Sequence, residues 1–229
     1  MEFLIISLLS IILIFVLFAI FGVNMKKLKE MTNIKELDKI SDKYPSNIKI
    51  CKEYLKKLKN EEVKIEENEG SDATVYIAIT NKISIGNLRN SYTRIQTIAH
   101  ECLHSIQNRK ILLFNFIFSN IYLIYFFAVL IIAIFGKLPN QMACITTLAI
   151  LGIVYLIVRM YLENDALIKA RYLAKEYMEE KEISTKGEIE KMIQQYDIVN
   201  DLGIKCVHYQ LALNVLAKIA ILSLVCFWR

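Results

Sequence analysis

The hydrophobic positions of this chain gather into four long runs that are separated by two polar segments. A helix needs about 20 consecutive apolar residues to cross the hydrocarbon core of a bilayer. Four stretches meet that length, at residues 3–23, 111–136, 141–160 and 206–228. The pattern therefore predicts a mainly α, multi-pass membrane protein, divided into an anchor (1–24), a polar segment (25–110), a transmembrane hairpin (111–160), a second polar segment (161–205) and a last span (206–229).

Within the first polar segment, the apolar positions of residues 25–60 recur at helical spacing. Pro45 interrupts them, and Ser46 is placed to cap a second helix that ends near Leu58. The acidic run 61–69 indicates a solvated loop. β-Branched and aromatic residues at 74–80 and 83–85 then predict a small hairpin or a pair of short edge strands.

Helical spacing returns at residues 92–110, which lead almost directly into the second apolar run. The third run is expected to continue past Tyr161 as a polar helix. Thr185 and Glu188 suit the capping box of a further helix. That helix is expected to end near Asn200, because the run 201–203 should break it before the last span.

Composition and charge support the membrane assignment and suggest an orientation. Hydrophobic residues make up 55% of the chain, the mean hydropathy is +0.38, and 17 of the 28 lysines and arginines lie in residues 24–110, with 7 more in 161–205. Because basic loops stay in the cytoplasm, both polar segments are expected on that side, with the two termini outside. This topology accounts for the pI near 8.8 without a nucleic-acid partner. Glu2 favours a retained anchor over the alternative of a cleaved signal peptide.

The five cysteines are scattered along the chain and form no CxxC pair. Cysteines in apolar spans and in reducing cytoplasmic segments seldom form a disulfide framework. We interpret them as packing residues.

The sequence His100-Glu101-Cys102-Leu103-His104 carries the clearest chemistry. On a helix, His100 and His104 project from one face and suit two ligands of one tetrahedral zinc. Glu101 lies about 100 degrees round the helix, where its carboxylate can act as the base toward a zinc-bound water. The chain has only three histidines, so two in one motif argue against chance, although a surface helix with incidental histidines is the alternative.

A third ligand is needed, and Glu163 is the leading candidate. The hairpin of residues 111–160 returns the chain to the side that it left, which brings Glu163 to the side of the two histidines. Asp165 is then a candidate to bond the distal nitrogen of a ligand histidine. The alternative is that Glu163 and Asp165 only solvate a helix end.

These motifs resemble a known family. The run of residues 100–107 followed downstream by Glu163-Asn164-Asp165-Ala166 is similar to the YugP-like neutral zinc metallopeptidases of bacterial membranes, whose members typically show HEVGHAIQ and VEFDAS. The order of anchor, zinc helix, hydrophobic pair, acidic helix and final span is also similar. Two departures stand out: Leu103 replaces the family's glycine, and 70–73 stands in place of its NHYDP-like segment.

The resemblance implies a gluzincin-like zinc site at the cytoplasmic interface, with one Zn²⁺ per chain, Glu163 as third ligand and Asp165 as its companion. It also gives a role to an edge strand, because HExxH peptidases commonly hold an extended substrate against one. Here that strand would use Val75, Tyr76, Ile77, Ala78 and Ile79, although packing alone is the alternative.

The resemblance further implies a residue that stabilises the oxyanion. Tyr209 is the candidate because it opens the last span, and neighbouring His208 is the other option. Interfacial tyrosines are also common membrane anchors, which is the simpler interpretation of Tyr209.

The leading hypothesis is a membrane-embedded zinc metallopeptidase that hydrolyses peptides or membrane proteins at the cytoplasmic face, with Glu101 as general base. The alternative is a non-catalytic zinc-binding scaffold or adaptor in the bilayer. An intramembrane protease of the site-2 type is disfavoured because charged residues flank the motif on both sides. A transporter is disfavoured because the spans offer little to line a path. The physiological substrate and the oligomeric state stay open.

Overall fold

A computed structural model describes residues 1–32, 34–71, 73–88 and 91–229. The described chain is mainly helical with one small sheet. Its helices are α1 (Glu2–Phe21), α2 (Met25–Met31), α3 (Lys35–Ser41), α4 (Asn47–Lys57), α5 (Arg94–Ile106), α6 (Arg109–Ile134), α7 (Gln141–Lys181) and α8 (Lys186–Trp228); its strands are β1 (Lys64–Glu67), β2 (Val75–Ile77) and β3 (Lys82–Ile85). The chain forms two compact units, one of residues 1–23, 114–161 and 205–229 and one of 24–113 and 162–204.

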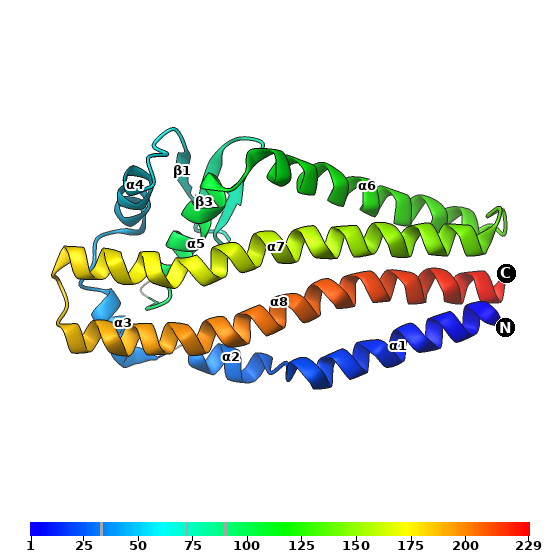
Figure 1. The fold of residues 1–229 in the computed structure, drawn as a ribbon, viewed down its shortest axis with the longest axis horizontal. Coiled ribbons are helices and arrows are strands. Elements are labelled where there is room, and N and C mark those ends of the chain that lie inside the picture. Colours follow the sequence, from blue (N-terminus) through cyan, green and yellow to red (C-terminus); the bar gives the residue numbers. More distant parts are fainter. Residues whose placement is uncertain (33, 72, 89–90) are drawn as a thin grey trace. The chain divides into compact units, whose positions relative to one another are not determined.

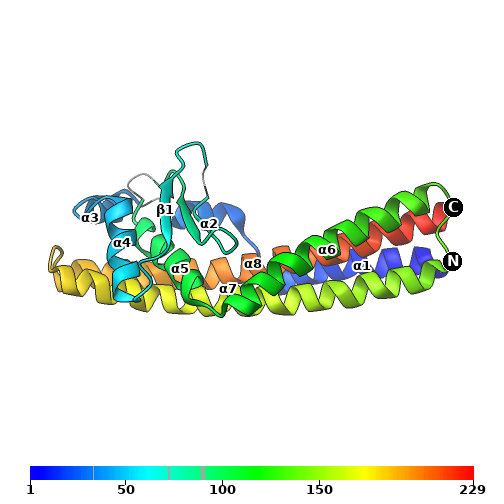
Figure 2. The same ribbon diagram turned by 90° about the horizontal axis from the view of Figure 1, so that it is seen from above.

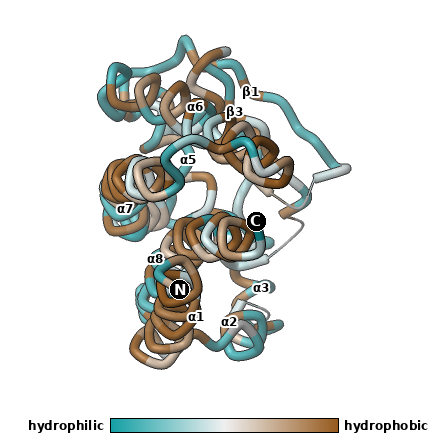
Figure 3. The backbone as a smooth tube through the Cα atoms, turned by 90° about the vertical axis from the view of Figure 1, so that its right-hand side faces the viewer, coloured by the Kyte–Doolittle hydropathy of each residue, from teal (hydrophilic) through white to brown (hydrophobic). Residues whose placement is uncertain are grey.

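The first unit contains α1, most of α6, the first half of α7 and the second half of α8. These are the four helices that are long and apolar enough to cross a membrane, and α1 is hydrophobic along most of its length (Figure 3). Within this unit the N-terminus, the C-terminus and the turn between α6 and α7 lie at the same end (Figures 1 and 2). The predicted hairpin is therefore present as two apolar helices, α6 and α7, which residues 135–140 connect.

The second unit contains α2 to α5, the sheet, and the polar halves of α7 and α8. Its core is built from one stripe of each long helix, with Ala166, Ala170 and Ala174 of α7 fully buried. The four-residue spacing puts these three alanines on one face of α7, and that face belongs to the core. Tyr196 of α8 adds a buried hydroxyl that donates to the carbonyl of Tyr92, just before α5. This core is what fixes α5 in place.

The three strands lie in the order β1-β3-β2, so β2 occupies one edge of the sheet. β2 and β3 pair antiparallel as the predicted hairpin, while β1 pairs with β3 in parallel. The prediction of a solvated loop at 61–69 was wrong, because residues 64–67 form β1. Val63, just before β1, is buried in the core at 5% exposure, whereas the side chains of β1 are mostly exposed. The strand that pairs with β1 is distant in sequence, so the polar residues of β1 alone did not indicate a strand.

The predicted strand at 74–80 is shorter than expected, because β2 ends at Ile77 and residues 78–81 form a turn. Ile77 pairs with Lys82, so the chain has to reverse over these four residues. Asn81 supplies the left-handed conformation of the turn, with a φ of 47°. Its side-chain oxygen accepts the Tyr76 hydroxyl at 2.9 Å.

Two helix boundaries also differ from the prediction. The first helical stretch is divided into α2 and α3, with Asn33 outside the described residues. The break expected at 201–203 is absent, because α8 runs continuously from Lys186 to Trp228. A single helical glycine such as Gly203 costs only about 1 kcal/mol relative to alanine, and a helix can absorb that. The capping box is confirmed: Thr185 and Glu188 exchange backbone-to-side-chain hydrogen bonds at 2.9 and 3.3 Å.

Candidate metal centre

α5 presents one face to the core and leaves its two histidines on another. Ile95, Ile98, Ala99 and Cys102 are fully buried and belong to the core cluster that also holds α4 and the polar half of α7. The histidine side chains are not on that face: those of His100 and His104 are 14% and 12% exposed. The amphipathic pattern of α5 thus sets the direction of the candidate ligands.

His100, His104 and Glu163 converge in the second unit. The Nε2 atoms of the two histidines lie 3.0 Å apart, and each lies 3.6 Å from the Oε2 atom of Glu163. The point equidistant from the three atoms is about 2.0 Å from each, which matches the bond lengths that zinc makes to imidazole nitrogen and carboxylate oxygen. The rings stand nearly perpendicular, at 89°. Three donors with this spacing can hold one metal ion.

Gln107 connects His104 to α7. Its amide nitrogen donates to the Leu162 carbonyl at 2.8 Å and to Asp165 Oδ2 at 3.2 Å. Both of those partners accept hydrogen bonds, so the amide oxygen of Gln107 is the atom that faces His104 Nδ1, at 2.8 Å. His104 must then carry its proton on Nδ1, which leaves the Nε2 lone pair directed at the candidate centre.

The sequence predicted a direct hydrogen bond from Asp165 to a ligand histidine, whereas in the structure Asp165 acts on His104 through Gln107. It bonds Gln107, and Gln107 bonds the histidine. Lys169 lies 2.5 Å from Asp165 Oδ1. Burial alone would raise the pKa of Asp165, but the hydrogen bonds from Lys169 and Gln107 outweigh it and hold the pKa below the ordinary value. Asp165 is thus an ionised acceptor at neutral pH.

Sequence reasoning missed this role of Gln107. Gln107 is three residues after His104, which is the spacing at which two side chains share one helix face. The three-residue spacing was therefore visible in the sequence, but the spacing alone did not indicate that Gln107 bonds His104. His100 differs from His104, because its buried Nδ1 has no hydrogen-bond partner among the residues that the structure describes.

Glu101 has one carboxylate oxygen toward the histidines and the other toward the sheet. Oε1 lies 3.9 Å from His100 Nε2, and Oε2 accepts the backbone N–H of Tyr76 at 2.6 Å. Burial raises the pKa of Glu101 above its ordinary value, and the two histidines and the Tyr76 N–H offset part of this effect. A buried carboxylate with a raised pKa is suited to accept a proton.

The pKa of His104 is also displaced. Burial would lower it, but the hydrogen bond and charge of Glu163, together with the charge of Glu101, outweigh burial and raise it. Two carboxylates at this short range favour any cation at the site, whether it is a proton or a metal ion. Metal and proton therefore compete for the same nitrogen.

Residues 75–79, the expected substrate strand, are divided between a strand and a turn. Val75, Tyr76 and Ile77 form the edge strand β2, whereas Ala78 and Ile79 lie in the turn that follows. In an antiparallel pair, successive residues direct their N–H groups to opposite sides. The N–H of Tyr76 is held by Glu101, so this residue is the one in β2 that points away from β3.

The remaining predicted residues fall elsewhere. Tyr209 belongs to the first unit, where its ring packs edge-on against Phe18 at 5.6 Å, and neighbouring His208 packs against Phe21. An oxyanion role for either stays a prediction. All five cysteines are free thiols, and buried Cys51 and Cys102 contact each other at 3.7 Å.

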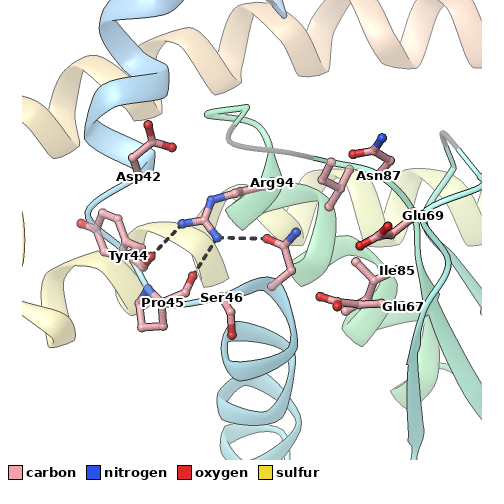
Figure 4. A pocket seen from close by; sticks show the side chains of 12 residues that line it. Asp42, Tyr44, Pro45, Ser46, Glu67, Glu69, Ile85, Asn87 and Arg94 are labelled. Atoms are coloured by element: carbon pink, nitrogen blue, oxygen red, sulfur yellow. Dashed lines mark hydrogen bonds between the residues drawn. The ribbon is translucent and has the colours of Figure 1, made fainter.

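A second candidate site is a cavity of about 330 Å³ near the start of α4, which the three candidate ligands do not line (Figure 4). Arg94 lies beside it, only 4% exposed. Its five N–H groups are all used, by Ser41, Tyr44, Pro45 and Asn47 at 2.6 to 3.0 Å. No donor is left for an anionic ligand, so Arg94 serves to fix the turn before α4 to the start of α5.

Comparison with known proteins gave no family model, curated protein or solved structure that matches this chain. Within the residues that the structure describes, the fold and site define a mainly helical protein with four candidate membrane spans and one group of two histidines and a glutamate able to hold a metal ion.

Proposed function

We propose that this protein is a membrane-embedded zinc metallopeptidase that hydrolyses peptide bonds at the cytoplasmic face of the membrane. The observation that carries the proposal is the joint placement of the ligand triangle and of Glu101. A structural zinc site is usually closed by four protein ligands, whereas a catalytic site keeps one position open. The group described here offers three ligands and adds a carboxylate beside them.

Each residue has a definable task in this reaction. His100, His104 and Glu163 bind the ion. Zinc, when bound, makes a water molecule acidic enough to lose a proton near neutral pH and polarises the carbonyl of the substrate. Glu101 takes that proton through Oε1 while the Tyr76 N–H holds Oε2 in place, and it returns the proton to the leaving amine.

Two further arguments support the proposal. The motifs resemble those of the YugP-like metallopeptidases, and the downstream glutamate of the resemblance is the residue that lies beside both histidines. The excess of basic residues in the two polar segments is typical of cytoplasmic segments, which supports a site on that side of the membrane. A peptide or membrane protein that reaches this surface is the expected substrate class.

The test uses the purified full-length protein in detergent, with metal analysis and cleavage of quenched fluorescent peptides as two separate measurements. We expect about one zinc per chain, and loss of the zinc in His104→Ala and in Glu163→Ala. Glu101→Gln should keep the zinc and lower cleavage at least about 100-fold. Glu61→Gln, a change to an exposed glutamate, is the control and should alter neither measurement.

The two measurements separate the possible failures. Zinc that binds stoichiometrically without any cleavage by the wild-type protein would favour a zinc-binding scaffold. Full cleavage by Glu101→Gln would refute the role of the base. Absence of bound metal from the wild-type protein would refute the metal centre itself.

A further inference from the structure

Lys218 is a charged residue in the middle of the apolar half of α8. It lies 13 residues from Lys205 and 11 from Arg229, which is about 20 Å and about 16 Å along a helix. In a spanning helix that position is near the centre of the hydrocarbon layer, beyond the reach of a lysine side chain to either headgroup region. A charge at that depth usually faces protein and marks a functional contact.

The surroundings of Lys218 orient its ammonium group but do not neutralise it. Lys218 Nζ donates to Asn214 Oδ1 at 2.8 Å and lies 4.2 Å from the centre of the Tyr122 ring. Tyr155 stacks on Tyr122 at 5.5 Å and lies 6.0 Å from the ammonium. Aromatic faces attract a cation, yet they carry no net charge.

The position of Tyr122 is built into the packing of three helices. Gly152 of α7 has no side chain at the point where a Cβ atom would lie 3.0 Å from the Tyr122 hydroxyl and 2.6 Å from Val215 of α8. Tyr122 itself is 1% exposed. The aromatic contact with Lys218 is therefore a fixed feature of the bundle.

A countercharge is missing from the spans of this chain. Residues 1–23, 114–161 and 205–229 contain one acidic residue, Glu2, at the very start of α1. A second copy of the chain has no carboxylate to offer at the depth of Lys218 either. The carboxylate that would neutralise Lys218 must therefore come from a helix outside these spans.

Lys218 is also part of a polar stripe. Gln210, Asn214 and Lys218 follow one another at four-residue intervals on the continuous helix α8, so they share one face over about 12 Å. Gln210 and Asn214 are exposed and Lys218 is partly exposed. Polar side chains on one face of a spanning helix are a common means of holding a second helix, because lipid cannot satisfy them.

We propose that Gln210, Asn214 and Lys218 form a docking face for a transmembrane helix that carries an aspartate or glutamate near the middle of its span. A carboxylate there would pair with Lys218, and the two amides would bond polar groups one and two turns along the partner. A lipid phosphate is a poorer fit, because it lies at the headgroup level. This inference rests on the membrane insertion proposed above and is independent of peptidase activity.

The test measures energy transfer in phosphatidylcholine vesicles between the labelled full-length protein and synthetic helices of leucine and alanine. The helices differ only at their centre, which is Glu, Gln or Leu. We expect the Glu helix to associate roughly tenfold more tightly than the Leu helix. Lys218→Met should abolish this preference, and Lys218→Arg should keep it. Lys137→Met, which removes a cation from the turn between α6 and α7, is the matched control and should keep it too.

Several results would overturn the proposal. One is equal association of the Glu and Leu helices with the wild-type protein, and another is a preference that survives Lys218→Met. A Gln helix that binds as well as the Glu helix would show that charge is not recognised. Loss of the preference when phosphatidylglycerol is added would assign Lys218 to lipid. Protein that fails to float with the vesicles would overturn the membrane placement and the docking face together, whereas a lack of peptide cleavage would affect neither.

Discussion

Removal of the Gln107 amide tests how the candidate metal centre holds His104 in one tautomer. In Gln107→Leu, the Nδ1–H of His104, the Leu162 carbonyl and Asp165 each lose a hydrogen bond. Nothing then favours the proton on Nδ1, and the ring is free to turn its protonated nitrogen toward the centre. Loss of such an outer partner typically lowers metal affinity 10- to 100-fold, or about 1.4 to 2.7 kcal/mol.

Zinc affinity is measured by competition with a chromophoric chelator at fixed pH, with thermal unfolding as the check on folding. Asp165→Ala should weaken zinc binding less than Gln107→Leu does, because the Leu162 carbonyl still holds the amide of Gln107. Asn108→Ala is the matched control: it removes an amide next in sequence that bonds Lys110 N instead of the histidine. Equal losses in Gln107→Leu and Asp165→Ala would refute the proposed order of contacts, as would unchanged affinity in Gln107→Leu.

Three other predictions follow from the same unit. Tyr76→Pro removes the N–H that holds Glu101 without removing a hydrogen bond to β3. Its peptide cleavage should fall about tenfold below that of Tyr76→Ala, with zinc content unchanged. Equal cleavage rates in the two variants would contradict a role of the Tyr76 N–H in holding Glu101. Burial raises the pKa of Glu53, but hydrogen bonds from Lys181 and Tyr177 outweigh burial and hold this pKa below its ordinary value. The stabilisation that ionised Glu53 gives the fold is therefore present above the pKa of the unfolded chain and is lost as pH falls through the folded-state pKa. Glu53→Gln should lower the unfolding temperature at pH 7, and the difference in unfolding temperature from wild type should close below about pH 4. Leu103→Gly should cost about 4 kcal/mol in unfolding measurements and weaken zinc binding, because it loosens the helix that carries both histidines; unchanged zinc affinity would contradict this role of Leu103.

The convergence of the ligands was accessible from the sequence because it depends on two simple regularities. A four-residue spacing on a helix brings His100 and His104 together whatever surrounds them. A hairpin of two apolar runs returns the chain to the side that it left, which brings Glu163 within range. Neither argument needs any knowledge of packing.

The parts that sequence reasoning missed depend on contacts between distant segments. β1 pairs in parallel with β3 across the turn and the edge strand that separate them, and its exposed acidic side chains look like those of a loop. The hydrogen bond from Tyr76 to Glu101 joins residues 25 positions apart in a direction that no local pattern gives. The continuity of α8 past Gly203 likewise reflects the packing of Met192 and Tyr196, whose burial outweighs the weak propensity of one glycine.

Leu103 is the position at which the motif departs from the one it resembles, and the fold gives this leucine a packing role that the sequence alone did not indicate. From the sequence, a leucine at the point where the YugP-like metallopeptidases have a glycine adds bulk beside the candidate metal site and leaves the fit of a substrate open. In the structure Leu103 is 7% exposed and belongs to the core cluster that includes Ala99 and Cys102 of the same helix. A residue buried there acts on the site through the position of α5. A glycine at this point would remove that packing and loosen the helix that carries both histidines, so in this chain the leucine stabilises the geometry on which the candidate metal centre depends.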